Sequence, residues 1–159
     1  MADILTPTQR SQMMARIRGK DTEPEFLVRR ALHRRGFRYR LHDKRLPGKP
    51  DLVFPGLHAV ILVHGCFWHG HDCHLYRLPS TRPEFWLGKI ERNRANDEKV
   101  EKRLEELGWR QMVIWECALR GKERLPPDAV ADEAAGWLRS SVPTAEIRGV
   151  KKLTDGGSR

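Results

Sequence analysis

The sequence predicts an α/β fold in which a central mixed β-sheet is flanked by helices on its faces. Helical and strand-like segments alternate closely along the chain, which is typical of this class. The 159 residues suffice for one domain with a substantial core, and no internal repeat is visible. We expect a basic helical arm at residues 1–20, a folded domain at 21–142 and a disordered tail at 143–159.

Positive charge is concentrated in the N-terminal third of the chain. The formal net charge is +9, and residues 1–50 contain 13 Lys or Arg against 5 Asp or Glu. Thr6 before Pro7 predicts a first helix that reaches Arg18 and ends at Gly19. This helix could pack weakly on the domain or lie against DNA as a basic arm. A concentrated basic surface favours nucleic acid as the partner over a merely solvated surface.

A capping box opens the folded domain. Thr22 and Glu25 have the spacing of this motif, so a helix is expected to run to Arg35 and to end at Gly36. Glu25 is therefore a helix cap first, although it could also face a metal site. Residues 37–42 then alternate apolar and polar side chains, which predicts a half-buried strand with its basic side outward.

Two short apolar runs predict a β-hairpin. Residues 51–54 form the first strand, residues 58–63 form a buried second strand, and a Pro-Gly pair makes the turn between them. Asp51 is an acidic residue at the head of an otherwise apolar strand. The hairpin is expected to carry it toward the region of His64.

The longest predicted helix follows. Thr81 and Glu84 have capping-box spacing, and the helical pattern continues to Leu107. Asp97 falls on the stripe that faces the domain, where a carboxylate needs a partner. It either satisfies a buried polar group or orients a catalytic histidine, and the unassigned histidines of the chain favour the second interpretation.

The C-terminal part predicts one more strand and one more helix. Residues 109–115 are strongly apolar, and Pro126 starts a helix whose apolar stripe is made of Val130, Ala134, Trp137 and Leu138. After Val142 the chain becomes polar and glycine-rich, which indicates the disordered tail.

Residues 61–74 hold four histidines and two cysteines directly after a strand-like run. Cys66, His71 and Cys73 lie close enough to share one ion, and Cys117 can join them if its strand neighbours the preceding one. This set predicts a closed, structural Cys3His zinc site. The alternative is that the three cysteines are unrelated buried thiols.

Asp51, His64 and His69 are the candidates for catalysis. Mg2+ can be held by a single aspartate when DNA phosphates complete its shell, and a histidine can take a proton from the attacking water. Taken alone, each histidine is better explained as a surface residue or as a second zinc ligand. Their combination with Asp51 favours chemistry.

Phe67, Trp68 and Trp86 form a third group. They could pack over the hydrophobic core, the usual role of tryptophan, or they could insert as a wedge between base pairs. Lys89 and Asn93 follow Trp86 at helical spacing and suit contacts to phosphates or base edges.

Composition also bears on the compartment. No apolar run approaches the roughly 20 residues of a membrane span, and the N-terminus lacks the pattern of a signal peptide. Three cysteines are an odd number and argue against a disulfide framework. We therefore expect a cytoplasmic protein with no membrane contact, associated with the nucleoid when it binds DNA.

Five motifs match a known family: Pro50-Asp51, His64-Gly65-Cys66-Phe67-Trp68-His69, Cys73, Thr81-Arg82-Pro83-Glu84-Phe85-Trp86 and Trp115-Glu116-Cys117-Ala118-Leu119-Arg120-Gly121. Over roughly residues 5–140 the chain resembles the very short patch repair (Vsr) endonucleases. The resemblance implies a relative of the type II restriction endonuclease fold, and residues 21–142 are then the endonuclease domain. It also implies strand-specific nicking of DNA on the 5′ side of the T in T:G mismatches, the lesion left by deamination of 5-methylcytosine.

The resemblance further implies roles for single residues. Asp51 and His69 would serve as Mg2+ ligand and general base, with His64, Asp97 and Glu25 in support. The aromatic trio would intercalate beside the mismatch, and the N-terminal helix, with Arg18, would grip the DNA from the other groove. A monomer is expected, and mismatch repair proteins and a cytosine methyltransferase system are the implied partners.

Two positions depart from the family pattern. Val63 stands where the family has threonine. The exchange is harmless if only the backbone carbonyl meets Mg2+, and it reduces activity if the threonine hydroxyl matters. Gly70 stands where a histidine is common, which makes His71 the clearer zinc ligand.

Two other functions compete with mismatch nicking. One is a zinc-stabilised DNA-binding module without turnover, and the other is a homing or restriction-like nuclease with a longer recognition site. A pure binder has no reason to keep Asp51 together with His69.

Overall fold

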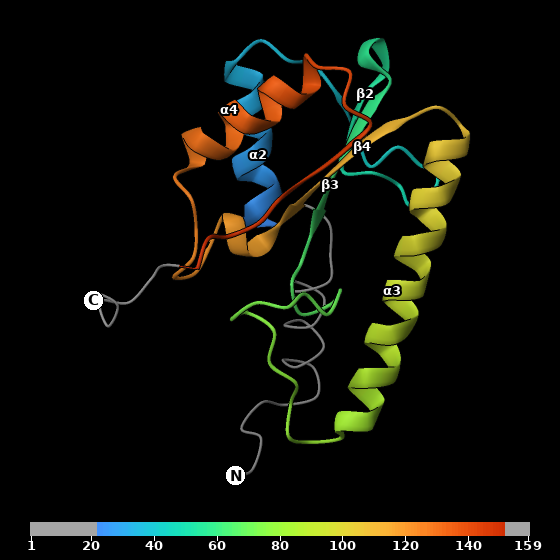
Figure 1. Ribbon diagram of the computed structural model, residues 1–159, viewed down its shortest axis with the longest axis vertical. Helices are drawn as coiled ribbons and strands as arrows, with labels where there is room; N and C mark the ends of the chain where they lie inside the picture. The colour runs from blue at the N-terminus through green and yellow to red at the C-terminus, as the bar shows by residue number, and fades with distance from the viewer. Residues whose placement is uncertain (1–21, 152–159) are drawn as a thin grey trace.

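The computed structural model describes residues 22–151, which form the predicted α/β fold (Figure 1). The elements follow one another in the order α2 (Glu23–Arg34), β1 (Arg40–Leu41), β2 (Leu52–Phe54), β3 (Ala59–His64), α3 (Pro83–Glu106), β4 (Arg110–Trp115), α4 (Pro127–Leu138) and β5 (Thr144–Ile147). The predicted N-terminal arm at residues 1–20, including Arg18, lies outside the described residues. Within them, no helix has the length and apolar character needed to cross a membrane.

The described strands form one mixed sheet in the order β1-β2-β3-β4-β5. β1, β2 and β3 are antiparallel, and Leu52 lies opposite Ile61 in the predicted hairpin. β4 runs parallel to both β3 and β5. The parallel register places His64 beside Trp115, so the carboxyl ends of β3 and β4 meet at one edge of the sheet.

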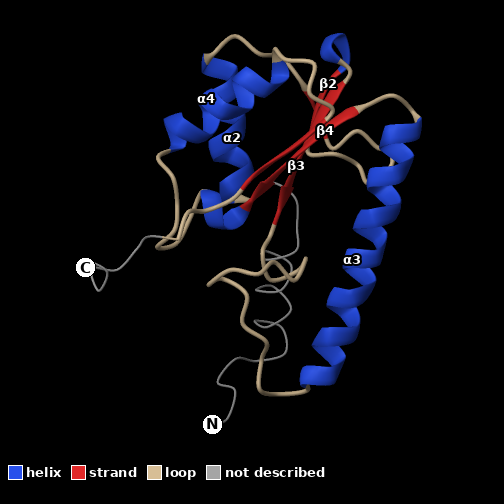
Figure 2. Ribbon diagram, in the orientation of Figure 1, coloured by secondary structure: helices blue, strands red, loops and turns tan. Residues whose placement is uncertain are grey.

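Helices cover both faces of the sheet, as Figure 2 shows. Alternate strand residues such as Ile61 and Met112 pack with α2 and α4 in the larger core. The residues between them, such as Val60 and Leu62, pack with Leu104 of α3 on the opposite face. This alternation is the physical basis of the layers, because successive strand side chains point to opposite sides of a sheet. The predicted fold class is confirmed.

The two predicted capping boxes have different outcomes. Thr22 and Glu25 form the motif at the start of α2, with both reciprocal hydrogen bonds present. The predicted box of Thr81 and Glu84 is wrong, because α3 begins at Pro83 after Arg82. Arg82 adopts a left-handed backbone with φ of 54°, so the chain bends between Thr81 and the first helical turn.

The predicted strand over residues 37–42 is shorter in the structure. Only Arg40 and Leu41 pair with β2. Phe37 and Tyr39 instead pack edge-on against Phe54, with ring centroids 6.2 and 5.7 Å away. The alternating pattern thus matches the burial of residues 37–40, but Leu41 is exposed and His42 is half-buried, so it holds only in part for burial as well as for pairing.

The predicted disordered tail is wrong for its first part. Residues 144–147 form β5, which pairs with β4, and Ile147 is fully buried. Only Ala145 and Ile147 of this strand are apolar, so the periodic signal is too short to stand out from a polar context. The backbone of β4 supplies the hydrogen bonds that order the segment. Residues 152–159 lie outside the described part of the chain.

Candidate functional site

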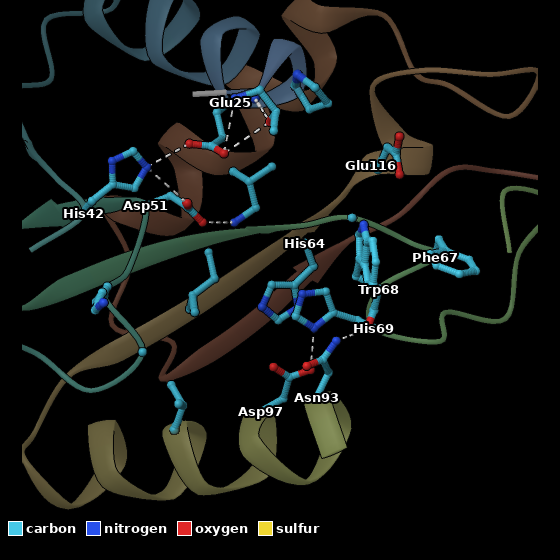
Figure 3. A pocket seen from close by; sticks show the side chains of 18 of the residues that line it. Glu25, His42, Asp51, His64, Phe67, Trp68, His69, Asn93, Asp97 and Glu116 are labelled. Atoms are coloured by element: carbon cyan, nitrogen blue, oxygen red, sulfur yellow. Dashed lines mark hydrogen bonds and ion pairs between the residues drawn. The ribbon is translucent and has the colours of Figure 1, made fainter. Parts of the chain in front are cut away.

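The candidate site is an open groove of about 1390 Å³ at the carboxyl end of β3. Its walls come from α2, α3, β3 and the loop that follows β3. Pockets for small molecules measure roughly 300–1,000 Å³, so this groove suits a larger substrate. In Figure 3 Glu25 on α2 and Asp97 on α3 lie on opposite sides, with His64 and His69 between them.

Asp51 lies in the groove just before β2. Because β2 is antiparallel to β3, the start of β2 meets the end of β3, and Asp51 Oδ2 accepts the Val63 backbone N–H at 2.6 Å. This contact brings the Asp51 carboxylate to the backbone of Val63. The predicted approach of Asp51 to the His64 region is therefore observed, since both line the same groove.

The surroundings of Asp51 disfavour the charged form of its carboxyl group unless a cation is nearby. Burial raises the pKa of Asp51 to about 7, and the nearby Glu25 adds to the increase. A buried carboxylate with such a pKa takes a proton near neutral pH, unless a positive ion is present to stabilise the charge.

Glu25 combines the two roles that the sequence left open, because it caps α2 and also faces the groove. It caps α2 through Thr22, and its Oε1 lies 3.0 Å from Arg29 Nη2. The same oxygen lies 2.9 Å from His42 Nε2, which in turn lies 3.5 Å from Asp51 Oδ1. Glu25, His42 and Asp51 thus form one connected group in the groove.

His42 is the site residue that sequence reasoning missed. The alternating pattern of residues 37–42 assigned it to a basic, outward-facing side. In the structure its backbone is left-handed, with φ of 45°, and its amide donates to the Asp51 carbonyl. The position of His42 depends on this bend, for which the alternating pattern gives no signal.

His64 and His69 form a parallel ring stack with centroids 3.9 Å apart and an interplanar angle of 3°. Asp97 Oδ2 lies 2.6 Å from His69 Nδ1. The contact to a histidine is therefore the alternative that the structure supports for Asp97. A proton on Nδ1 directed to this carboxylate leaves Nε2 of His69 as the free base.

His64 differs from its stacked neighbour. Burial lowers the pKa of His64 to about 3, and the nearby His69 contributes to the decrease. His64 is therefore neutral at physiological pH. The two rings can divide their tasks, one staying uncharged while the other exchanges protons.

A second cluster consists of Cys66, His71, Cys73 and Cys117, whose donor atoms all lie within 4.8 Å of one another. The Sγ atoms of Cys66 and Cys117 each lie 3.6 Å from His71 Nδ1. A tetrahedral zinc ion with ordinary bond lengths would separate sulfur and nitrogen ligands by about 3.5 Å. The four residues therefore fit a closed metal site, and the predicted convergence of Cys117 is observed.

The surroundings of this cluster also suit a metal. Burial raises the pKa of Cys66 and of Cys117, so a nearby cation is needed for these thiolates to form. The Gly149 amide donates to Cys117 Sγ at 3.2 Å. A Cβ at Gly149 would lie 2.4 Å from the Cys117 carbonyl oxygen, so glycine permits this close approach.

Phe67, Trp68 and Trp86 gather in one aromatic cluster, with centroid separations of 5.0 to 5.8 Å. Trp68 is buried, whereas Phe67 and Trp86 are partly exposed. Asn93 Nδ2 donates to the Trp68 carbonyl at 2.9 Å, so its amide anchors the loop instead of pointing freely toward a ligand. Lys89 Nζ lies 5.7 Å from the Trp68 ring centroid.

The sequence is similar to those of known DNA nicking enzymes. The family described as DNA mismatch endonuclease Vsr matches residues 2–75. The DNA mismatch endonuclease Vsr of Escherichia coli (strain K12) is 42% identical over 147 residues, which are 92% of this chain and 94% of that protein. The type II nicking enzyme V.XorIIP of Xanthomonas oryzae pv. oryzae is 50% identical over 119 residues, or 75% of this chain and 88% of that protein. The type II nicking enzyme V.NmeAIP of Neisseria meningitidis serogroup A is 47% identical over 122 residues, or 77% and 87%.

The match to the Escherichia coli protein extends over nearly the whole of both chains. The resemblance carried by the short motifs is therefore confirmed over nearly the whole sequence. The chain belongs to the Vsr family of DNA mismatch endonucleases.

Proposed function

We propose that this protein nicks one strand of duplex DNA on the 5′ side of the T in a T:G mismatch, in very short patch repair. Membership in the Vsr family supports a DNA nicking endonuclease of mismatch repair. The observation that carries the chemistry is the groove in which Asp51 and the hydrogen-bonded pair His69 and Asp97 are brought together.

Asp51 is the proposed holder of Mg2+, with the backbone carbonyl of Val63 as the second protein ligand. Oxygen donors of this kind are those that Mg2+ prefers, and DNA phosphates and water would complete the shell. When bound, Mg2+ would polarise a phosphoryl oxygen as a Lewis acid. The short contact between Asp51 and the Val63 amide supports the pairing of these two residues.

His69 is the proposed general base. Its Nδ1 is directed to Asp97, which leaves Nε2 to accept the proton of the attacking water. His64 supports the ring by stacking and remains neutral. Glu25 holds the first turn of α2 and orients His42 beside Asp51.

The cysteine cluster is proposed to bind zinc for structure alone. Cys66, His71, Cys73 and Cys117 supply four ligands, so no position stays open for substrate. The ion would tie the loop after β3 to the end of β4. Through this link it would fix the loop that carries His69 and the aromatic cluster.

Recognition of the mismatch is assigned to the aromatic cluster. Phe67 and Trp86 offer partly exposed rings for a wedge, backed by the buried Trp68. Unstacking is least costly where base pairing is already imperfect, which favours a mismatch. Lys89 would meet phosphate, and Arg18 would bind DNA from the N-terminal arm.

The protein is proposed to act on double-stranded DNA as a monomer. Mismatch repair proteins and a cytosine methyltransferase system are its proposed functional partners. A non-catalytic DNA-binding module is disfavoured, because such a protein would gain nothing from a half-buried Asp51 with a raised pKa or from the short contact of His69 with Asp97. Nothing in residues 22–151 favours a longer recognition site.

The test is nicking of end-labelled duplexes that differ only in one T:G or T:A pair, with Mg2+ or with EDTA. We expect a single nick 5′ of the mismatched T, only in the T:G duplex and only with Mg2+. Binding of the T:G duplex without any nick would support the non-catalytic module instead. Equal nicking of both duplexes would favour the restriction-like alternative.

A further inference from the structure

We propose that Trp115, oriented by Glu146, is a positioning residue that links the zinc cluster to the catalytic histidines. This inference rests on the proposed function of His69. Neither residue belongs to the candidate catalytic or metal-binding sets. Trp115 lies in a family motif. Glu146 lies in β5, in a segment whose composition predicted a disordered tail.

The sheet places Trp115 beside the site. Trp115 lies opposite His64 in the parallel β3–β4 pair, at the carboxyl ends of both strands. The neighbouring Ile114 is buried in the core beneath α2 and α4, so strand alternation turns Trp115 toward the opposite face. Trp115 and His64 accordingly line one hollow on that face, together with Glu146.

Trp115 contacts rings from both clusters. The His71 ring stacks on it, with centroids 3.9 Å apart and an interplanar angle of 11°. His64 and His69 meet it nearly perpendicular, at 5.2 and 6.2 Å. One indole therefore touches a proposed zinc ligand and both histidines of the groove.

Glu146 fixes the rotation of this indole. Trp115 Nε1 donates to Glu146 Oε1 at 2.8 Å, across the β4–β5 pair. An aromatic ring in an edge-to-face arrangement can slide or tilt at low energetic cost, and a directed hydrogen bond removes much of that freedom. β5 thereby contributes to the site although it supplies no reacting group.

The histidine pair needs such support. The described residues offer His64 Nδ1 no hydrogen-bond partner, so ring contacts hold this side chain. Asp97 fixes His69 through Nδ1 alone, which still permits the ring to tilt about that hydrogen bond. The His64 stack and the Trp115 edge restrict this tilt and so set the position of His69 Nε2.

The experiment compares Glu146→Ala, Glu146→Gln and Trp115→Phe with the wild type. The matched control is Trp109→Phe, because Trp109 lies just before β4, at the end of the strand remote from Trp115, and its ring centroid is 4.8 Å from that of His58. Four quantities are measured: zinc content, melting temperature, affinity for a T:G duplex, and the single-turnover nicking rate constant. Histidine ring NMR signals are recorded in the absence of DNA.

Glu146→Ala and Trp115→Phe should nick about tenfold more slowly, since a misplacement of about 1 Å can cost up to about 100-fold. Zinc content and DNA affinity should stay at wild-type values, so the change falls on the rate constant and not on binding. Glu146→Gln should restore most of the rate, because its amide oxygen can still accept the indole N–H. The NMR signals of His64 and His69 should shift in Glu146→Ala.

Unchanged His64 and His69 signals in folded, zinc-containing Glu146→Ala would overturn the proposal. A loss of zinc or of folded protein large enough to explain the lower rate would overturn it as well. If the wild type fails to nick T:G duplexes, the proposed function fails, and the NMR comparison still decides whether Trp115 and Glu146 position the histidines.

Discussion

Two clusters draw most of their residues from one stretch of chain, residues 64–73, and they differ in donor chemistry and in access. Cys66, Cys73 and Cys117 offer soft thiolate donors and His71 a borderline one, and the four donor atoms converge as a closed metal site requires. His64 and His69 come from the same stretch of chain but line an open groove with Asp51. Residues from one stretch of chain therefore belong to two sites of different geometry, and the proposed division gives the closed one a structural role and the open one the chemistry.

Geometry separates these roles more sharply than residue type does. A metal ion held by four protein ligands cannot bind substrate without losing one of them, whereas a single carboxylate leaves most positions to water and phosphate.

Cys117→Ser should abolish the closed site. Binding of structural zinc is worth about 10–16 kcal/mol in small zinc domains, and a domain is stable by only about 5–15 kcal/mol. Loss of one ligand should therefore remove zinc and unfold most of the protein, as measured by elemental analysis and circular dichroism. The matched control is His74→Gln, a histidine of the same loop outside the ligand set, which should keep its zinc. A folded, zinc-free Cys117→Ser protein would contradict the structural role.

Asp51→Asn should act on the open site alone. Removal of a metal ligand costs several kcal/mol in the transition state, which is about 1000-fold in single-turnover nicking. Zinc content and T:G affinity should stay near wild type, because the carboxylate is not proposed to bind DNA directly. Asp72→Asn, at an exposed acid of the loop that follows β3, should nick normally. Near-normal nicking by Asp51→Asn would remove Asp51 from the reaction.

The pKa of Asp51, about 7, predicts how Mg2+ binding depends on pH. The carboxyl must release its proton to hold the ion, so the apparent affinity should fall about tenfold for each pH unit below 7. The increase in melting temperature caused by Mg2+ should be large at pH 8, small at pH 6 and absent in Asp51→Asn. An equal increase at both pH values would contradict this assignment.

The same shift affects the metal-free protein. Between its ordinary pKa of 3.8 and about 7, the folded state keeps a proton on Asp51 that the unfolded state has released, so this group destabilises the fold as pH rises. His64 acts in the opposite direction, because its pKa falls from 6.5 to about 3 and stability is lost as pH falls through that interval. The melting temperature of the metal-free protein is measured against pH for the wild type and for Asp51→Asn. The variant retains only the contribution of His64, so the difference between the two curves is that of Asp51.

Trp86→Ala should distinguish mismatched from matched DNA. Stacking of one base on an aromatic ring is worth about 1–3 kcal/mol, so T:G affinity should fall about tenfold or more while T:A affinity changes little. Leu87→Ala, at the next and more exposed position of α3, is the control and should leave both affinities unchanged. Fluorescence anisotropy measures both. Equal losses on the two duplexes would assign Trp86 to the core.

Val63→Thr should have the smallest effect. The proposed Mg2+ contact uses the backbone carbonyl, which this exchange preserves, so the nicking rate should change by less than about threefold. A rate increase well above that value would show that a hydroxyl at this position takes part in the reaction.

The local sequence patterns predicted most of the fold. Hydrophobic alternation placed the hairpin of β2 and β3, and the Thr22–Glu25 capping box placed the start of α2. β5 could not be found in this way, because its order comes from pairing with β4 and not from its own composition. The start of α3 was misplaced because Arg82 adopts a left-handed backbone, which its local sequence does not predict.

The sequence located both clusters of the site and missed their connections. Ligand spacing identified the cysteine set, and helical spacing placed Asp97 on the face where it meets His69. His42 and Trp115 escaped notice, since each gains its role from neighbours that are distant in the chain. Such contacts depend on backbone bends and strand register, which no local pattern encodes.

The most direct test of the division between the two sites is a metal-exchange measurement on the wild type. Protein with one bound zinc is depleted of Mg2+, its zinc content is verified, and single-turnover nicking of a T:G duplex is followed before and after Mg2+ is returned. The proposed roles predict no nicking in the zinc-loaded, Mg2+-free protein and full recovery on addition of Mg2+, with zinc unchanged throughout. Nicking that persists without Mg2+, or that rises and falls with zinc content alone in folded protein, would contradict the division of roles between the two sites.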